Sequence, residues 1–246
     1  LLSVMAQPDQ RAPLSLTDSG EQFRQPLSRD FKGVRIGWST DLGGLPVDTR
    51  VVQTLEKGRA VLDNLGCELD KRFPDFSGAD EIFKTWRAWL YEGRCGAHLK
   101  THRDQIKDTV IWNTESGQKL TGPELGRMEM LRTALYHRVR VFMETHEFLC
   151  LPVAQVPPFP VEQEYITEIN GIQMETYLDW MRSCYFITVT GLPAISVPCG
   201  FTEDGLPVGL QIVGRNRDEL GVLQLAYAFQ QANPVWQQVP EVAQPS

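Results

Sequence analysis

Two short apolar segments near the end of the chain constrain the fold more than any other feature. They span residues 194–197 and 208–213, and glycine and proline residues flank both of them. The polar segment 202–205 between them ends in Asp-Gly, which is a strong signal for a β-hairpin. Unbroken apolar segments of this length are typical of strands that are covered on both faces. The sequence therefore predicts a hairpin in the middle of an α/β sheet.

The composition indicates a globular protein and disfavours several other classes. Of the 246 residues, 42% are hydrophobic and 22% are charged, which is ordinary for a domain with a substantial core. The formal net charge of −7 disfavours a nucleic-acid or membrane partner. No apolar segment approaches the roughly 20 residues that span a bilayer. The five cysteines are widely spread and include no C-x-x-C pair, so we expect reduced thiols in a cytoplasmic protein.

A βαβ unit is predicted in the first third of the chain. Its strands are expected at 34–38 and 67–69, and a helix at 49–65 joins them, with Asp48 as its N-cap. Two strands joined by a helix are usually parallel, so the sheet should carry helices on its faces. The polar and proline-rich residues 7–30 predict a surface loop.

The rest of the chain continues to alternate between helical and extended patterns. The expected elements are helices at 80–102, 121–146, 171–183 and 220–231, a strand at 148–153, a loop at 103–121 and a polar tail at 233–246. This alternation indicates an α/β protein.

No motif of a catalytic or metal site is found by inspection. The sequence has no G-x-S-x-G, Walker or H-E-x-x-H pattern. Ser196 lies inside an apolar segment, so we interpret it as a core hydroxyl, and we interpret Cys199 as a buried, unreactive thiol. His98 and His102 have the spacing of metal ligands on a helix, but no third ligand is apparent and no metal site is predicted.

Three segments resemble the amidase signature family. The hairpin segments T-G-L-P-A-I-S-V-P-C-G-F and G-L-P-V-G-L-Q-I-V-G are similar to its C-terminal region, and D-E-L-G-V-L-Q-L-A-Y-A-F-Q-Q is similar to its last helix. The opening L-L-S-V-M-A-Q-P-D-Q-R-A-P-L-S resembles the residues that follow its signature segment. The resemblance implies that residues 1–246 are the C-terminal portion of one amidase domain. It also implies an α/β/α fold, in which helices cover both faces of a mixed β-sheet.

The resemblance further implies the chemistry and its missing parts. The family hydrolyses carboxamides with a nucleophilic Ser, a second Ser and a Lys. These groups belong to the family's N-terminal half, and this sequence has no Ser-Ser pair, so we expect no catalytic residue here and an inactive chain. No cofactor is implied. The segment before the hairpin would form part of the substrate pocket, and we select Trp180, Cys184 and Thr188; packing of these residues in the core is the alternative.

Two other functions remain compatible with the sequence. One is the amidase subunit of a tRNA-dependent amidotransferase, which shares the same hairpin and requires partner subunits. The other is a non-catalytic binding or scaffold module. In each case a sheet that continues into absent strands would leave an edge uncovered, so we also expect self-association.

Overall fold

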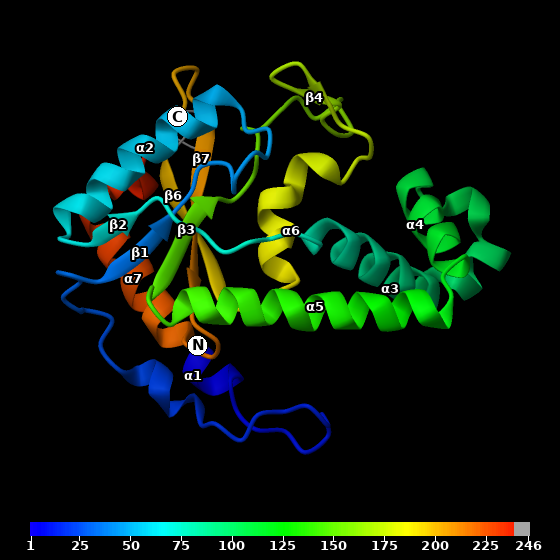
Figure 1. The fold of residues 1–246 in the computed structure, drawn as a ribbon, viewed down its shortest axis with the longest axis horizontal. Coiled ribbons are helices and arrows are strands. Elements are labelled where there is room, and N and C mark those ends of the chain that lie inside the picture. Colours follow the sequence, from blue (N-terminus) through cyan, green and yellow to red (C-terminus); the bar gives the residue numbers. More distant parts are fainter. Residues whose placement is uncertain (239–246) are drawn as a thin grey trace, which may run out of the picture.

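The computed structural model describes residues 1–238, and its centre is a five-stranded mixed sheet (Figure 1). The strands lie in the order β2-β1-β3-β7-β6. β1 is parallel to both β2 and β3, and β7 is antiparallel to both β3 and β6. The bounds are β1 Arg35–Trp38, β2 Glu68–Asp70, β3 Phe148–Pro152, β6 Ala194–Phe201 and β7 Pro207–Gly214. The predicted βαβ unit and the predicted hairpin are both confirmed.

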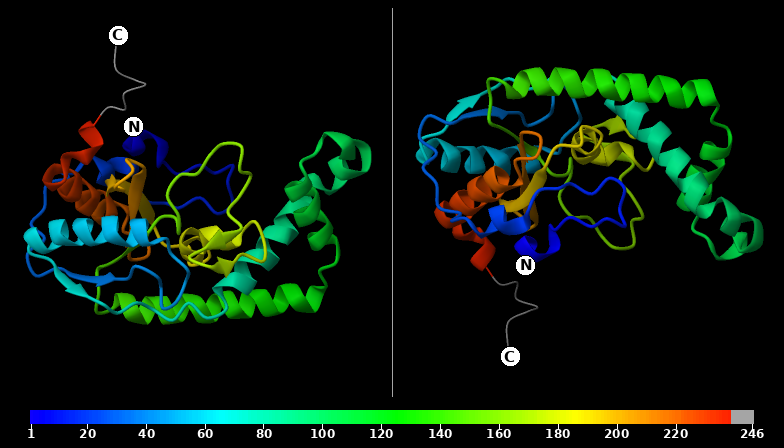
Figure 2. Two further views of the ribbon diagram at one scale, coloured as in Figure 1. Left: turned by 90° about the horizontal axis from the view of Figure 1, so that it is seen from above. Right: turned by 90° about the horizontal axis from the view of Figure 1, so that it is seen from below.

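Helices cover both faces of this sheet, as expected. α2 (Thr49–Asn64) and α7 (Glu219–Ala232) pack on one face, and α3 (Ala79–Thr101), α5 (Gly122–Met143) and α6 (Arg182–Thr188) lie on the other (Figures 1 and 2). Asp48 caps α2, and Thr121 and Glu124 form a reciprocal capping box at α5. The α/β/α architecture therefore follows from local signals that the sequence carries.

The central strand β3 explains why its sequence is apolar without a break. Phe148 and Cys150 belong to the core cluster under α2 and α7, whereas Leu149 and Leu151 belong to the cluster under α3, α5 and α6. All four side chains are fully buried. Alternate residues of a strand face opposite sides, so a strand between two helical layers needs apolar residues at every position. Each such Leu or Phe side chain contributes about 1.5–3 kcal/mol by its burial.

The prediction of a loop at 103–121 is wrong. Residues Arg103–Gln105 form the short 3-10 turn η2, and Asp108–Gln118 form helix α4, which packs back along α3. We call the projecting pair α3 and α4 the arm, since it extends away from the sheet (Figures 1 and 2). The face of α4 that packs is made of Asn113, Thr114 and Gly117, so no apolar periodicity revealed this helix.

The prediction of a helix over 171–183 is wrong for its first half. The short strands β4 (Glu168–Ile169) and β5 (Ile172–Gln173) form a hairpin there. Asn170 and Gly171 make its turn with positive φ angles of 51° and 81°, which is the Asn-Gly turn signal. The 3-10 turn η3 (Asp179–Met181) follows and leads into α6.

The hairpin of β6 and β7 lies at the side of the sheet and not at its centre. β6 is an edge strand among the described residues, and Ala194, Ser196 and Pro198 are exposed along it. Ser196 is therefore not a core hydroxyl, because only one face of β6 is covered by helices.

The two ends of the described chain carry only short elements. Before β1, α1 (Leu2–Met5) precedes the predicted loop 7–30, and the 3-10 turn η1 (Gly20–Arg24) lies within it. Part of the predicted polar tail forms a 3-10 turn, η4 (Pro234–Gln237), and residues 239–246 lie outside the described part. Within residues 1–238, no helix combines the length and the apolar character needed to cross a membrane.

Candidate functional site

A cavity of about 300 Å³ opens beyond the carboxyl end of β3, next to the hairpin of β6 and β7. In open α/β sheets, ligands bind in crevices outside the carboxyl ends of the strands. We call this space the Trp180 cavity. Its lining is mainly apolar and comes from α2, the loop after β3, η3 and the hairpin: Val51, Val153, Ala154, Val156, Pro157, Pro158, Phe159, Trp180, Ser196, Pro207, Val208 and Gly209.

Two aromatic rings form one wall of the Trp180 cavity. The rings of Phe159 and Trp180 meet edge to face, with centroids 5.4 Å apart and planes at 88°. The indole Nε1 of Trp180 is buried and has no hydrogen-bond partner among residues 1–238. A buried donor without a partner costs about 1–3 kcal/mol, so this N–H is an unsatisfied group beside the cavity.

A buried glutamine anchors the loop after β3, whose neighbouring residues line the Trp180 cavity. Gln155 is fully buried, and its Nε2 donates to the Pro46 carbonyl at 2.8 Å. Its Oε1 accepts from the Ser183 backbone N–H at 3.4 Å, and its own carbonyl accepts from the Asp48 N–H at 2.8 Å. The loop after β3 is thus tied both to the start of α2 and to α6. Sequence inspection missed Gln155, although a lone polar residue in the segment V-A-Q-V-P-P was the available signal.

The three predicted pocket residues differ in their placement. Trp180 lines the cavity, whereas Cys184 and Thr188 are not among its lining residues. Cys184 is half-buried and Thr188 is exposed, and the Thr188 hydroxyl donates to the Cys184 carbonyl at 3.3 Å. Burial raises the pKa of the Cys184 thiol. Cys184 and Thr188 are four apart and share one side of α6, whereas Trp180 lies in the 3-10 turn η3 before this helix.

A buried ion cluster lies directly beside Trp180. The Asp179 side chain is 1% exposed, and its Oδ1 contacts Lys84 Nζ at 2.9 Å and Arg182 Nη2 at 3.0 Å. Its Oδ2 accepts from the Thr176 backbone N–H at 2.7 Å. Burial by itself would raise the pKa of Asp179, but these hydrogen bonds and charges lower it below its ordinary value. Asp179 is therefore an ionised carboxylate that joins η3 to α3.

Other groups considered as chemical sites have structural surroundings. Cys199 is buried, as predicted, and burial raises the pKa of its thiol to about 12, so it is a poor nucleophile. His98 and His102 stand with ring centroids 6.5 Å apart, and no group of three or more His, Cys, Asp or Glu side chains that could hold a metal occurs in residues 1–238.

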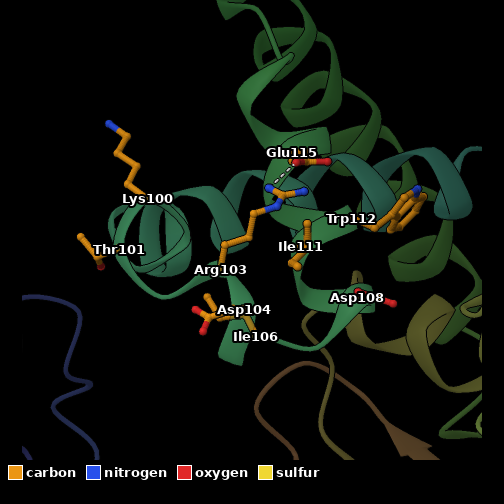
Figure 3. A pocket seen from close by; sticks show the side chains of 9 residues that line it. All are labelled: Lys100, Thr101, Arg103, Asp104, Ile106, Asp108, Ile111, Trp112 and Glu115. Carbon is orange, nitrogen blue, oxygen red and sulfur yellow. Dashed lines mark hydrogen bonds and ion pairs between the residues drawn. The ribbon is translucent and has the colours of Figure 1, made fainter.

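A second, wider cavity of about 780 Å³ lies at the tip of the arm (Figure 3). An ion pair between Arg103 and Glu115, with 2.7 Å between Nη1 and Oε1, lies among its lining side chains. Both partners are exposed, and Trp112 beside them is 44% exposed. Exposed, paired charges bind a ligand weakly, so the Trp180 cavity is the better candidate.

A family model and the relatives found by sequence comparison all indicate the same protein family. The model of the amidase family matches residues 1–223. An acylamidase of Rhodococcus erythropolis is 30% identical over 239 residues, covering 95% of this chain and 50% of the relative. One subunit of the glutamyl-tRNA(Gln) amidotransferase of Thermodesulfovibrio yellowstonii is 28% identical, covering 95% of this chain and 52% of that relative.

A solved structure of similar fold agrees with the sequence matches. A bacterial aryl acylamidase of the amidase signature family superimposes with a TM-score of 0.80 at 23% identity, over 93% of this chain and 49% of that chain. This likeness confirms the expected fold. The chain spans about half the length of the curated relatives it matches.

Proposed function

The chain belongs to the amidase signature family, and on that premise we propose that it forms part of an amidase. The reaction is hydrolysis of a carboxamide C–N bond to a carboxylic acid and ammonia or an amine. The match of the family model to residues 1–223 carries this proposal. The similarity to an acylamidase over 95% of the chain supports it.

We propose that this chain supplies one wall of the substrate pocket. The Trp180 cavity has the size of a small ligand site and a mainly apolar lining, to which Ser196 adds a hydroxyl, and the buried Trp180 Nε1 has no partner among residues 1–238. It suits an apolar acyl or amine portion of the amide, with an acceptor atom near Trp180 Nε1. Cys184 and Thr188 follow along the same side of α6 and would contact parts of the substrate beyond the cavity.

The catalytic groups are proposed to come from polypeptide outside these 246 residues. The sequence contains no Ser-Ser pair, so the family's two serines have no counterpart in it. A neutral lysine and a bridging serine would activate the nucleophile, and backbone N–H groups would stabilise the oxyanion. The chain alone is therefore proposed to be inactive, and no cofactor enters the reaction.

A direct assay tests this proposal. The 246-residue chain and a longer protein that adds an amidase N-terminal half are compared on acetamide and acetanilide, after removal of host amidases. We expect turnover only by the longer protein. In that protein, Trp180→Ala should raise the KM for acetanilide about tenfold, equivalent to about 1.4 kcal/mol of lost binding. Trp89→Ala, at an exposed position of α3, is the control and should leave KM unchanged. Turnover by the short chain would contradict the proposal.

A second candidate is the amidase subunit of a tRNA-dependent amidotransferase. The 28% identity to one such protein favours it. This function requires partner subunits, so retention of them during purification of the tagged protein from its source would support it. Failure to retain any partner, together with amide turnover by the longer protein, would favour the stand-alone amidase. A non-catalytic scaffold would show neither property.

The location and association of the chain are also proposals. We propose a cytoplasmic protein, supported by five cysteines that form no disulfide. We also propose self-association through the exposed edge of β6, because an unpaired strand edge offers free backbone groups to a second copy.

A further inference from the structure

Residues 156–180 form a strap whose two ends supply the aromatic wall of the Trp180 cavity. Phe159 stands near its start and Trp180 at its end, and the two rings are in contact. Between them lies the hairpin of β4 and β5, whose turn residue Asn170 donates from Nδ2 to the Val47 carbonyl at 2.8 Å. The position of the strap therefore sets the distance between this wall and the strands.

The arm holds the strap at Tyr177, three residues before Trp180. The Tyr177 hydroxyl accepts a hydrogen bond from Arg87 Nη2 at 3.1 Å and another from Asn113 Nδ2. Arg87 belongs to α3 and Asn113 to α4, so both helices of the arm converge on one oxygen. The edge of the Tyr177 ring also meets Trp112, with centroids 5.9 Å apart.

Helix α3 holds the strap at a second residue, Asp179, which follows Tyr177 after Leu178. Lys84 of α3, less than one turn before Arg87, binds the buried carboxylate of Asp179 at 2.9 Å. These two contacts are separated by one residue of the strap and by two residues of the helix, so together they fix the position and the rotation of the strap. Within α3, Arg87 Nη2 also donates to the Tyr91 hydroxyl at 2.9 Å, and the Tyr91 ring lies 4.6 Å from the guanidinium, but Tyr91 makes no hydrogen bond to the strap among residues 1–238.

We propose that Lys84, Arg87 and Asn113 are positioning residues for the amide substrate, which act by clamping the strap through Tyr177 and Asp179. The arm then determines which substrates the Trp180 cavity admits, although its tip lies far from the strands. This inference rests on the proposed function, because it takes the Trp180 cavity as part of the substrate pocket. A loosened strap would impair binding of a large amide more than binding of a small one.

Tyr177→Phe tests the clamp, and Tyr91→Phe is its matched control. Each variant removes one hydroxyl that accepts from Arg87, but only Tyr177 belongs to the strap. Hydrogen exchange of the 246-residue chain should show amides of 156–180 exchanging about tenfold faster in Tyr177→Phe, which matches loss of hydrogen bonds worth about 1.4 kcal/mol. Tyr91→Phe should change them less than about twofold. Equal exchange in both variants would overturn the clamp.

A substrate measurement completes the test. In the longer protein with the N-terminal half, Tyr177→Phe should raise KM for acetanilide about fivefold with kcat nearly unchanged, and leave KM for acetamide unaltered. Arg87→Lys keeps the charge but loses the planar fork, so it should behave like Tyr177→Phe. Unchanged KM for both amides would overturn the positioning role. Exchange needs no turnover, so failure of the clamp is distinguishable from failure of the unaltered protein to hydrolyse either amide.

Discussion

Two buried glutamines in the same fold have opposite hydrogen-bonding states. Gln155 is fully buried, and both ends of its side-chain amide are bonded. Gln211 on β7 is 8% exposed, and its Oε1 has no partner among the described residues. A buried acceptor without a donor costs about 1–3 kcal/mol. Gln211 on β7 pairs with the exposed Ser196 on the neighbouring strand β6. A segment or ligand that covers this face of the sheet would be able to donate a hydrogen bond to Gln211 Oε1.

This difference predicts opposite effects of one substitution. Gln211→Met replaces an unsatisfied amide by an apolar side chain of similar length, so the free energy of unfolding of the chain should rise by about 1 kcal/mol. Gln155→Met removes two bonded groups and leaves the Ser183 N–H and the Pro46 carbonyl without partners. The free energy of unfolding should therefore fall by about 2–4 kcal/mol in this variant. Urea unfolding of the two variants measures both changes. A loss of stability in Gln211→Met would mean that its amide is bonded in solution.

The sequence could not distinguish these two residues. Each is a lone glutamine in an apolar segment, V-A-Q-V-P-P and G-L-Q-I-V-G. Their hydrogen-bond partners come from residues about 30 to 110 positions away, or are lacking among residues 1–238, and such pairings are set by tertiary packing. Trp180 was selected for the site through the resemblance to a family, and no local pattern identified Phe159 or Gln155 beside it.

At the level of elements, the strongest local signals were reliable and the weak ones were not. Apolar periodicity predicted α2 and α7, and N-terminal capping residues predicted the starts of α2 and α5; each of these helices buries a stripe of large side chains. Helix α4 and the hairpin of β4 and β5 were missed. α4 buries Asn113, Thr114 and Gly117 against α3, and an ideal Cβ on Gly117 would lie 2.2 Å from the Ala88 carbonyl oxygen. Close helix contact through small and polar residues leaves no hydrophobic pattern to detect.

The ion pairs of Asp179, which join η3 to α3, should make the free energy of unfolding depend on pH in the acid range. The pKa of Asp179 is lowered in the folded protein, so its ion pairs add stability above its ordinary pKa of 3.8. That contribution is lost as the pH falls through the lower folded value. Asp179→Asn should reduce the free energy of unfolding by roughly 3 kcal/mol at pH 7, because Lys84 and Arg182 lose a buried partner. The difference from the unaltered chain should shrink as the pH falls below 3.8.

Unfolding in urea from pH 7 to pH 2.5 measures this difference. Asp104→Asn is the control, since Asp104 is exposed and forms no ion pair with any residue of 1–238. It should stay within about 0.5 kcal/mol of the unaltered chain at pH 7. A gap between Asp179→Asn and the unaltered chain that is the same at pH 7 and pH 2.5 would show that the charge of Asp179 does not stabilise the fold.

For the whole molecule, the layers were predictable but the edges of the sheet were not. Apolar segments and the βαβ pattern indicate a sheet between helices, because each layer must bury one face of the next. The unbroken apolar sequence of β6 predicts a central strand. The structure places β6 at the edge, with Ile195, Val197 and Cys199 packed towards α2 and α7 and the alternate residues exposed. An edge strand whose exposed face is covered by a further layer of protein needs the same apolar sequence as a central strand. The local sequence alone therefore does not distinguish the two positions.

The free edge of β6 predicts how the chain behaves in solution. Ala194, Ser196 and Pro198 form an uncharged exposed row on a strand that has no neighbouring strand on its outer side among residues 1–238, which favours pairing with a second copy. Sedimentation velocity over a hundredfold range of concentration should therefore show association of the unaltered chain. Ser196→Lys places a charge on this row and should weaken association about tenfold or more, because two copies would bring like charges together. Ser28→Lys adds the same charge at an exposed position away from the sheet and should leave association unchanged. A monomer at every concentration, or equal weakening by both variants, would rule out pairing through β6.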